Sequence, residues 1–173
     1  MHATGSYSVH EVLADGCRVE IRVLRPDDRA ALLAAIEQTS SQSLYSRFFG
    51  VRRAFTEQEI TFFLNLDFVS HVALVAVVDE GNCPVIAGGG RYIVVQPGKA
   101  EVAFAVVDKY QRKGIGAALM RHLVAIARIA GLQELIAEVL PDNLPMLKVF
   151  EKSGLNLTTK RESGVLHVSL DLA

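Results

Sequence analysis

The sequence predicts an α+β fold, a mixed α/β arrangement in which a central, mostly antiparallel sheet is flanked by helices. Three observations predict it: helical segments precede a block of β-rich runs, a long amphipathic helix follows that block, and the chain closes with the pattern strand, helix, strand, strand. No repeat, low-complexity tract or linker divides the chain. We therefore expect one domain over residues 17–173, preceded by a flexible N-terminus over residues 1–16.

The N-terminal third is expected to hold one strand and several helices. Its start is rich in Ser, His, Gly and Thr, which predicts a loose end, whereas residues 17–24 alternate apolar and polar side chains as a strand does. Pro26 followed by two acidic residues is typical of a helix start, and residues 30–38 continue that helix. A short helix is expected at 43–49, and a capping box that begins at Thr56 predicts another.

The rest of the chain alternates between strands and helices. Three glycines at 88–90 lie within a β-rich run, where they permit a β-bulge or the close passage of a substrate. Gly114 opens a helix whose apolar residues recur at helical spacing, and Gly131 ends it. The other expected elements are an antiparallel meander over 72–78, 84–95 and 100–107, a strand at 135–140, a helix at 143–153, and strands at 155–159 and 164–170.

Composition excludes several classes of function. The chain has 173 residues, 50% of them hydrophobic, with 18 basic against 19 acidic residues, which argues against a general nucleic-acid or membrane-surface binder. Its 2 cysteines and 5 scattered histidines form no ligand cluster, so we expect no disulfide scaffold and no metal site. The longest apolar run, at 72–78, is too short to cross a bilayer, and the polar start lacks a signal-peptide core, which favours the cytoplasm.

One strand-to-helix loop has the composition of an anion site. It reads Gln111-Arg112-Lys113-Gly114-Ile115-Gly116-Ala117. Its glycines let the backbone approach a ligand closely, and the free amides at a helix start favour a phosphate or pyrophosphate. The arginine and the lysine add positive charge. The alternative is a tight turn in which glycine serves geometry alone and nothing binds.

Other motifs for phosphate binding or nucleophilic catalysis do not fit. Leu119 stands where a dinucleotide-binding fingerprint needs its third glycine, and the chain has no Gly-Lys-Ser or Gly-Lys-Thr that could end a P-loop. It also lacks a Gly-x-Ser-x-Gly nucleophile elbow and a His-Glu-x-x-His zinc helix. The loop is therefore either an anion site of a different kind or the turn that binds nothing.

The same loop resembles the Q/R-x-x-G-x-G/A acetyl-CoA signature of the GNAT N-acetyltransferases. A second block, in which Asn143 opens a helix and Phe150-Glu151-Lys152-Ser153-Gly154-Leu155 ends it, is similar to another block of that family. A closer resemblance is to the catalytic domain of bacterial Pat-type protein lysine acetyltransferases, through residues 43–49, 67–76 and 100–104. The likeness covers residues 17–171 and implies the GNAT fold and acetyl-CoA as co-substrate.

Glu101 is the expected general base. In a strand its side chain lies on the same face as Ala103 and Ala105, which leave room for a ligand, while Val102 and Phe104 face the other way. Without the resemblance, an exposed strand carboxylate paired with a basic neighbour is the favoured interpretation. The resemblance implies that it removes a proton from the acceptor amine, through a water molecule.

The resemblance also implies a set of acetyl-CoA contacts. Backbone groups of Val106 and Val107, left unpaired where two strands splay, would bond the pantetheine arm, and the amides from Gln111 to Ala117 would hold the pyrophosphate. Asn143 would bond the arm as well, although a helix N-cap explains it equally. Phe150 stands where many members have a tyrosine that protonates the leaving thiolate. That acid is therefore in doubt here, and Phe150 would only pack against the co-substrate.

Together these expectations describe an N-acetyltransferase that moves acetyl from acetyl-CoA to a primary amine, most plausibly a protein lysine, as a monomer or homodimer. One alternative is a small-molecule amine acetyltransferase. Another is a non-catalytic acyl-CoA sensor, which would keep the cradle but would not need Glu101.

Overall fold

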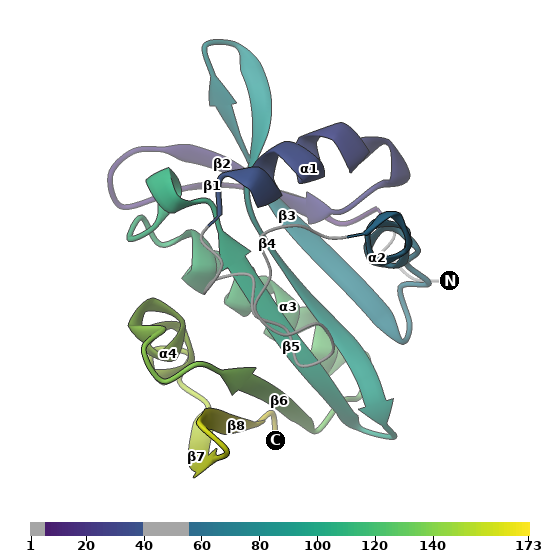
Figure 1. Cartoon of the computed structure of the whole chain (residues 1–173), viewed down its shortest axis with the longest axis vertical. Coiled ribbons are helices and arrows are strands. Elements are labelled where there is room, and N and C mark those ends of the chain that lie inside the picture. The colour runs from purple at the N-terminus through teal and green to yellow at the C-terminus, as the bar shows by residue number, and fades with distance from the viewer. Residues whose placement is uncertain (1–5, 40–55) are drawn as a thin grey trace.

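In the computed structural model, residues 6–39 and 56–173 are described. They form one eight-stranded sheet in the order β1-β2-β3-β4-β5-β6-β8-β7 (Figure 1). Neighbouring strands are antiparallel except β5 and β6, which are parallel. The strands are β1 Ser8–Val12, β2 Arg18–Val23, β3 His71–Glu80, β4 Cys83–Gln96, β5 Lys99–Val106, β6 Glu134–Val139, β7 Asn156–Glu162 and β8 Val165–Asp171.

The helices cover both faces of this sheet. In Figure 1, α1 and α2 lie in front of it and α3 lies behind, while α4 sits beside β6. The helices are α1 Arg29–Glu37, α2 Glu57–Leu64, α3 Ile115–Ile129 and α4 Leu144–Glu151, with short 3₁₀ turns at Pro26–Asp28 and Asp108–Tyr110. The mostly antiparallel α+β fold predicted from the sequence is confirmed.

The core has two parts, one on each side of the sheet. The larger part lies under α3, where Leu119 and Leu123 pack against Val102 and Phe104 of β5. The smaller part lies under α1. β3 faces both parts and is buried along most of its length, as its continuous apolar run indicates.

Local sequence signals placed several elements correctly. Thr56 caps α2: its hydroxyl accepts from the Glu59 N–H at 3.1 Å, and the Glu59 carboxylate accepts from the Thr56 N–H at 2.8 Å. The expected bulge is also present near the glycines, because the β3–β4 register shifts between Ala76 and Val77. The expected helix at 43–49 lies outside the described residues.

The expectation of a loose N-terminus is wrong for β1. Residues 8–12 form a strand that pairs with β2, so the sheet begins within the segment expected to be flexible. Tertiary contacts explain this order. Glu11 accepts hydrogen bonds from Arg121 at 3.0 and 3.2 Å and also contacts His122, so β1 is fastened to α3.

β5 and β6 separate soon after they meet. They pair only over Lys99–Glu101 and Glu134–Ile136, and beyond Glu101 no register continues. The Phe104 and Phe150 rings meet edge to face at 6.1 Å between centroids, so aromatic packing from α4 occupies part of the gap. This gap positions the candidate site.

Candidate active site

The loop before α3 takes a backbone conformation that depends on glycine. Gly114 is the N-cap of α3 and has φ +92°, and Arg112 also has a positive φ of 65°. A Cβ on Gly114 would meet nothing within 4 Å, so glycine is required there for conformation and not for space. Gly116 differs, because its Cβ would lie 3.1 Å from Val149 Cγ2 of α4. The first amides of α3 are thereby presented beside α4.

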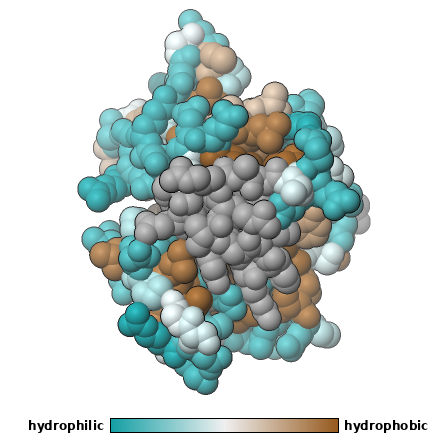
Figure 2. All heavy atoms as spheres, in the orientation of Figure 1, coloured by the Kyte–Doolittle hydropathy of each residue, from teal (hydrophilic) through white to brown (hydrophobic). Residues whose placement is uncertain are grey.

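A cavity of about 330 Å³ lies between this loop and α4. In Figure 2 the space between the two opens as a notch at the left edge of the molecule. Lys148 of α4 and Lys152, the residue that follows α4, line it with Arg112, and no carboxylate is among its described lining residues. The sequence reasoning missed both lysines. The lining includes Val106, Gln111, Arg112, Gly114, Ile115, Gly116, Ala117 and Asn143, all of which were expected to contact acetyl-CoA.

Lys113 does not line the cavity. Its ammonium forms an ion pair with Asp15 in the turn between β1 and β2, at 3.0 Å. The positive charge that the structure brings to the cavity therefore comes from Arg112 and α4 instead of from the adjacent lysine of the loop.

The two valines at the end of β5 differ from each other. The expectation of unpaired backbone groups is wrong for Val107, because its N–H donates to Ala87 O and its C=O accepts from the Tyr110 N–H, both at 2.8 Å. Since backbone groups alternate in direction along a strand, those of Val106 point toward the gap. The Val106 C=O accepts from Gln111 Nε2 at 3.1 Å. Of the two valines, Val106 is the one whose backbone groups face the gap.

Asn143 lines this cavity, whereas Phe150 lines a neighbouring one. Asn143 Oδ1 caps α4 by accepting from the Met146 N–H at 3.4 Å, which matches the helix-cap alternative. Phe150 is 1% exposed and lines a smaller cavity of about 20 Å³ between β5 and β6. Asn143 and Met146 line both cavities, which shows that they adjoin.

Glu101 lies on the far side of the smaller cavity. It is 8% exposed, so the alternative of an exposed strand carboxylate is wrong. It lines an open cavity of about 420 Å³ over β6, β8 and β7, together with Glu138, His167 and Lys160. Glu138 lies 3.5 Å from His167, and Lys160 forms an ion pair with Glu162 at 3.5 Å. Two carboxylates against one lysine make the described lining acidic. Glu138 also lines the smaller cavity. The cationic cavity, the narrow gap and the acidic cavity therefore follow one another across the sheet.

The described residues offer neither a metal site nor a membrane-spanning helix. They contain no group of three or more His, Cys, Asp or Glu side chains able to hold a metal ion. No helix among them is long and apolar enough to cross a bilayer.

Comparison with known families matches residues 39–155 to the acetyltransferase (GNAT) family. The chain belongs to this family. It is 33% identical to acetyltransferase Pat of Mycolicibacterium smegmatis over 156 residues, which cover 88% of this chain and 45% of that protein. It is 32% identical to acetyltransferase PA5475 of Pseudomonas aeruginosa over 126 residues, 72% of this chain and 68% of that protein. The chain thus spans about half the length of the Pat relative.

Solved structures agree with this membership. The GNAT domain of S. lividans PAT has a TM-score of 0.82 and 35% identity, covering 95% of this chain and 96% of that chain. A cAMP-binding acyltransferase from Mycobacterium smegmatis has a TM-score of 0.68 and 25% identity, and the match covers 99% of this chain and 49% of that chain. YncA from Salmonella typhimurium, solved with acetyl-CoA, shares the fold alone. Its TM-score is 0.71 and its identity is 18%, and the match covers 90% of this chain and 94% of that chain. This chain is therefore a GNAT acetyltransferase related to the GNAT domains of Pat proteins.

Proposed function

We propose that this GNAT acetyltransferase moves acetyl from acetyl-CoA to a protein lysine in the cytoplasm, with Glu101 as general base. The observation that carries the proposal is the order of the three cavities. A cationic cavity adjoins a narrow gap, and the gap adjoins an acidic cavity that contains a buried carboxylate. This order matches a substrate that carries phosphates at one end and a reactive group at the other.

The cationic cavity fits the phosphates of acetyl-CoA. The N-terminal amides of α3 and the positive end of its dipole favour an anion, and Arg112, Lys148 and Lys152 add charge without a competing carboxylate among the described lining residues. The pantetheine arm would then run past Val106 and Asn143 into the gap between β5 and β6. Binding there brings the thioester close to Glu101, which lowers the barrier through proximity.

The acidic cavity fits an amine acceptor. A lysine ammonium has a pKa of about 10.4, so near neutral pH it must lose a proton before it can attack. Glu101 and Glu138 attract the ammonium electrostatically, and Glu101 accepts the proton, directly or through a water molecule. The cavity is open and runs over several strands, which suits a side chain presented on a protein.

The transfer step can be written without an acid from the protein. The neutral amine nitrogen forms a bond to the thioester carbonyl carbon, its proton passes to Glu101, and the carbon–sulfur bond breaks with its electron pair left on sulfur. A thiol with a pKa of about 8.5 leaves as a thiolate at modest cost, so Phe150 need not be replaced by a proton donor. Phe150 would instead form an apolar wall of the gap.

The test is direct. Purified protein is incubated with acetyl-CoA and either lysine peptides, folded proteins or a panel of small amines, and CoA release and acetylated products are measured. Transfer to lysine supports the proposal, while transfer only to small amines would replace its acceptor. Binding of acetyl-CoA without any transfer would favour an acyl-CoA sensor.

A further inference from the structure

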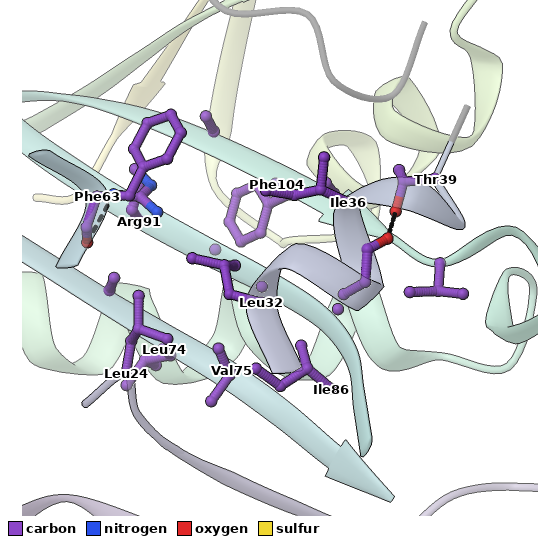
Figure 3. Close-up of a pocket in the computed structure, with 18 residues that line it drawn as sticks. Leu24, Leu32, Ile36, Thr39, Phe63, Leu74, Val75, Ile86, Arg91 and Phe104 are labelled. Carbon is purple, nitrogen blue, oxygen red and sulfur yellow. Dashed lines mark hydrogen bonds between the residues drawn. The ribbon is translucent and has the colours of Figure 1, made fainter. Parts of the chain in front are cut away.

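A second, apolar cavity lies on the α1 side of the sheet. Its volume is about 130 Å³, and it lies between α1, α2 and the central strands (Figure 3). It is distinct from the cationic and acidic cavities, although Ala103 and Phe104 line both it and the narrow gap. Its side chains are almost all apolar, with Leu24, Leu32, Ile36, Val75 and Ile86 prominent among them.

Among the described residues that line this apolar cavity, one side chain is charged. Arg91 of β4 lies beside Phe63 in Figure 3, with its guanidinium carbon 4.3 Å from the centre of that ring. Arg91 Nη1 lies 2.8 Å from His71 Nε2 and 3.4 Å from the Phe63 carbonyl oxygen, to which it donates. Burial, followed by the nearby Arg91 charge, lowers the pKa of His71 to about 4. At neutral pH the partners of Arg91 are therefore uncharged.

No carboxylate balances the charge of Arg91. Every Asp and Glu of the chain lies within residues 6–39 and 56–173, and none of their ion pairs includes Arg91. The side chain is partly buried, and desolvation lowers its pKa to about 10. A partly buried guanidinium with neutral neighbours gains most from an anion that can accept its hydrogen bonds, above all a carboxylate.

Gly89 leaves part of this cavity unfilled, because it has no side chain. A Cβ there would make only ordinary contacts, 3.4 Å from Leu74 O and 3.8 Å from Val75 Cγ1. Gly90 differs, since its Cβ would lie 2.6 Å from Phe104 Cδ1, so packing against the α3 side requires it. Packing therefore does not explain glycine at position 89, and the space it leaves belongs to the cavity.

The cavity also borders the gap that we propose holds the thioester. Arg91 is directly opposite Ala103 across the β4–β5 pair, and Ala103 borders the gap expected to hold the thioester. Directly opposed residues have Cβ atoms about 5 Å apart, so a chain of a few carbons spans that distance.

We propose that the Arg91 cavity binds a carboxylate carried on a short apolar chain, as part of one of the two substrates. This rests on the proposed acyl transfer in the adjoining gap. The carboxylate can come from two sources: the far end of an acyl group derived from a dicarboxylic acid, or an amine acceptor that is itself an amino acid. Arg91 fixes the carboxylate, and the apolar walls take up the chain.

The donor arm of the test compares succinyl-CoA with butyryl-CoA, which differ in the terminal carboxylate. The ratio of their kcat/KM values is expected to fall roughly 10- to 100-fold in Arg91→Met and to recover partly in Arg91→Lys. Arg128→Met is the matched control, because Arg128 also donates to a backbone carbonyl, that of Leu172, outside this cavity. Its ratio should not change.

The acceptor arm uses acetyl-CoA with β-alanine and with its amide, and the ratio of their rates is measured in the same variants. A loss in the donor arm assigns the carboxylate to the acyl group, and a loss in the acceptor arm assigns it to the amine. If neither ratio responds to Arg91→Met, the proposal is overturned.

A binding measurement separates this proposal from the proposed function. Calorimetry with glutarate should detect binding that its neutral diamide lacks, and Arg91→Met should abolish it. Gly89→Ala, which adds one methyl group without a clash, should weaken it and provides a second variant if Arg91→Met does not fold. Glutarate binding without any acyl transfer would support this site and reject the proposed function. Acyl transfer with neither glutarate binding nor a preference for carboxylate substrates would support the proposed function and reject the carboxylate site at Arg91.

Discussion

The two sides of the gap between β5 and β6 are built in different ways. The side that we propose binds acetyl-CoA is made largely from one stretch of chain, residues 111–117, and presents main-chain amides beside Lys148 and Lys152. The side that we propose binds the acceptor combines β4, β5, β6 and β8 and presents side chains, with Glu101 in the acidic cavity and Arg91 in the apolar one. A ligand common to a family can be held by backbone, whereas the choice of acceptor is left to side chains that can vary independently.

The largest expected effect tests the acceptor side. Glu101→Gln should lower kcat by roughly 10² to 10⁴ at neutral pH while acetyl-CoA affinity stays nearly unchanged, because the amide cannot accept the proton. Steady-state kinetics and calorimetry measure the two quantities. Glu20→Gln is the matched control, since Glu20 is also a strand carboxylate but accepts a hydrogen bond from Ser8 outside these cavities. Equal turnover of Glu101→Gln and wild type would remove the role from Glu101.

The next effect tests what holds α1 over the apolar cavity. Arg22 donates two hydrogen bonds to Asp28, at 2.8 and 2.9 Å, and the Arg25 N–H donates a third at 2.7 Å. Burial alone would raise the pKa of the Asp28 carboxyl, but these hydrogen bonds and the charge of Arg22 lower it below its ordinary value of 3.8. Asp28→Asn should therefore reduce the free energy of unfolding by about 2 kcal/mol at pH 7.

The pH dependence of that difference follows from the direction of the shift. A carboxyl with a lowered pKa in the folded state contributes stability above its unfolded pKa of about 3.9 and loses it as pH falls through the folded value. Urea denaturation of wild type and Asp28→Asn should thus converge in strongly acidic solution. A gap that stays constant down to the lowest pH would show that the ion pair is not its cause.

A third change separates binding from folding on the cofactor side. Gly114→Val places a β-branched residue at φ +92° and should cost about 1–3 kcal/mol of stability. Gly131→Val is its matched control, because Gly131 has φ +85° and equally open space at the other end of α3. Both variants should lose stability, but only Gly114→Val should weaken acetyl-CoA binding, by roughly tenfold or more. Equal affinities would favour a turn that binds nothing.

The smallest effect distinguishes the cations. Lys148→Met and Lys152→Met should each weaken acetyl-CoA binding about two- to fivefold, more at low salt, because exposed charge pairs are weak and screened. Lys113→Met should do less, since its ammonium is held by Asp15. Calorimetry at two salt concentrations measures this ranking. A larger loss for Lys113→Met would mean that Lys113 leaves Asp15 when the ligand binds.

How much the sequence predicted depended on how local each signal was. The capping box at Thr56 and the glycine that starts α3 each involve a few neighbouring residues, and both were predicted. β1 was missed because a short, half-exposed strand has a weak pattern of its own and is held by β2 and α3. Lys148 and Lys152 resemble ordinary surface lysines in the sequence, and only the position of α4 opposite the loop gives them a role.

The sequence by itself determined the family, the order of the strands and helices from β3 onward, and the conformation of the loop before α3, because periodicity, capping and positive φ are set by residues close together in the chain. Tertiary structure alone decided that Glu101 is buried, that Val107 is fully paired and that Arg91 lies in an apolar cavity without a carboxylate. These properties depend on the exclusion of solvent and on the distances between separate strands and helices. Both are fixed only when the sheet and its helices pack together, because the residues involved lie far apart in the sequence.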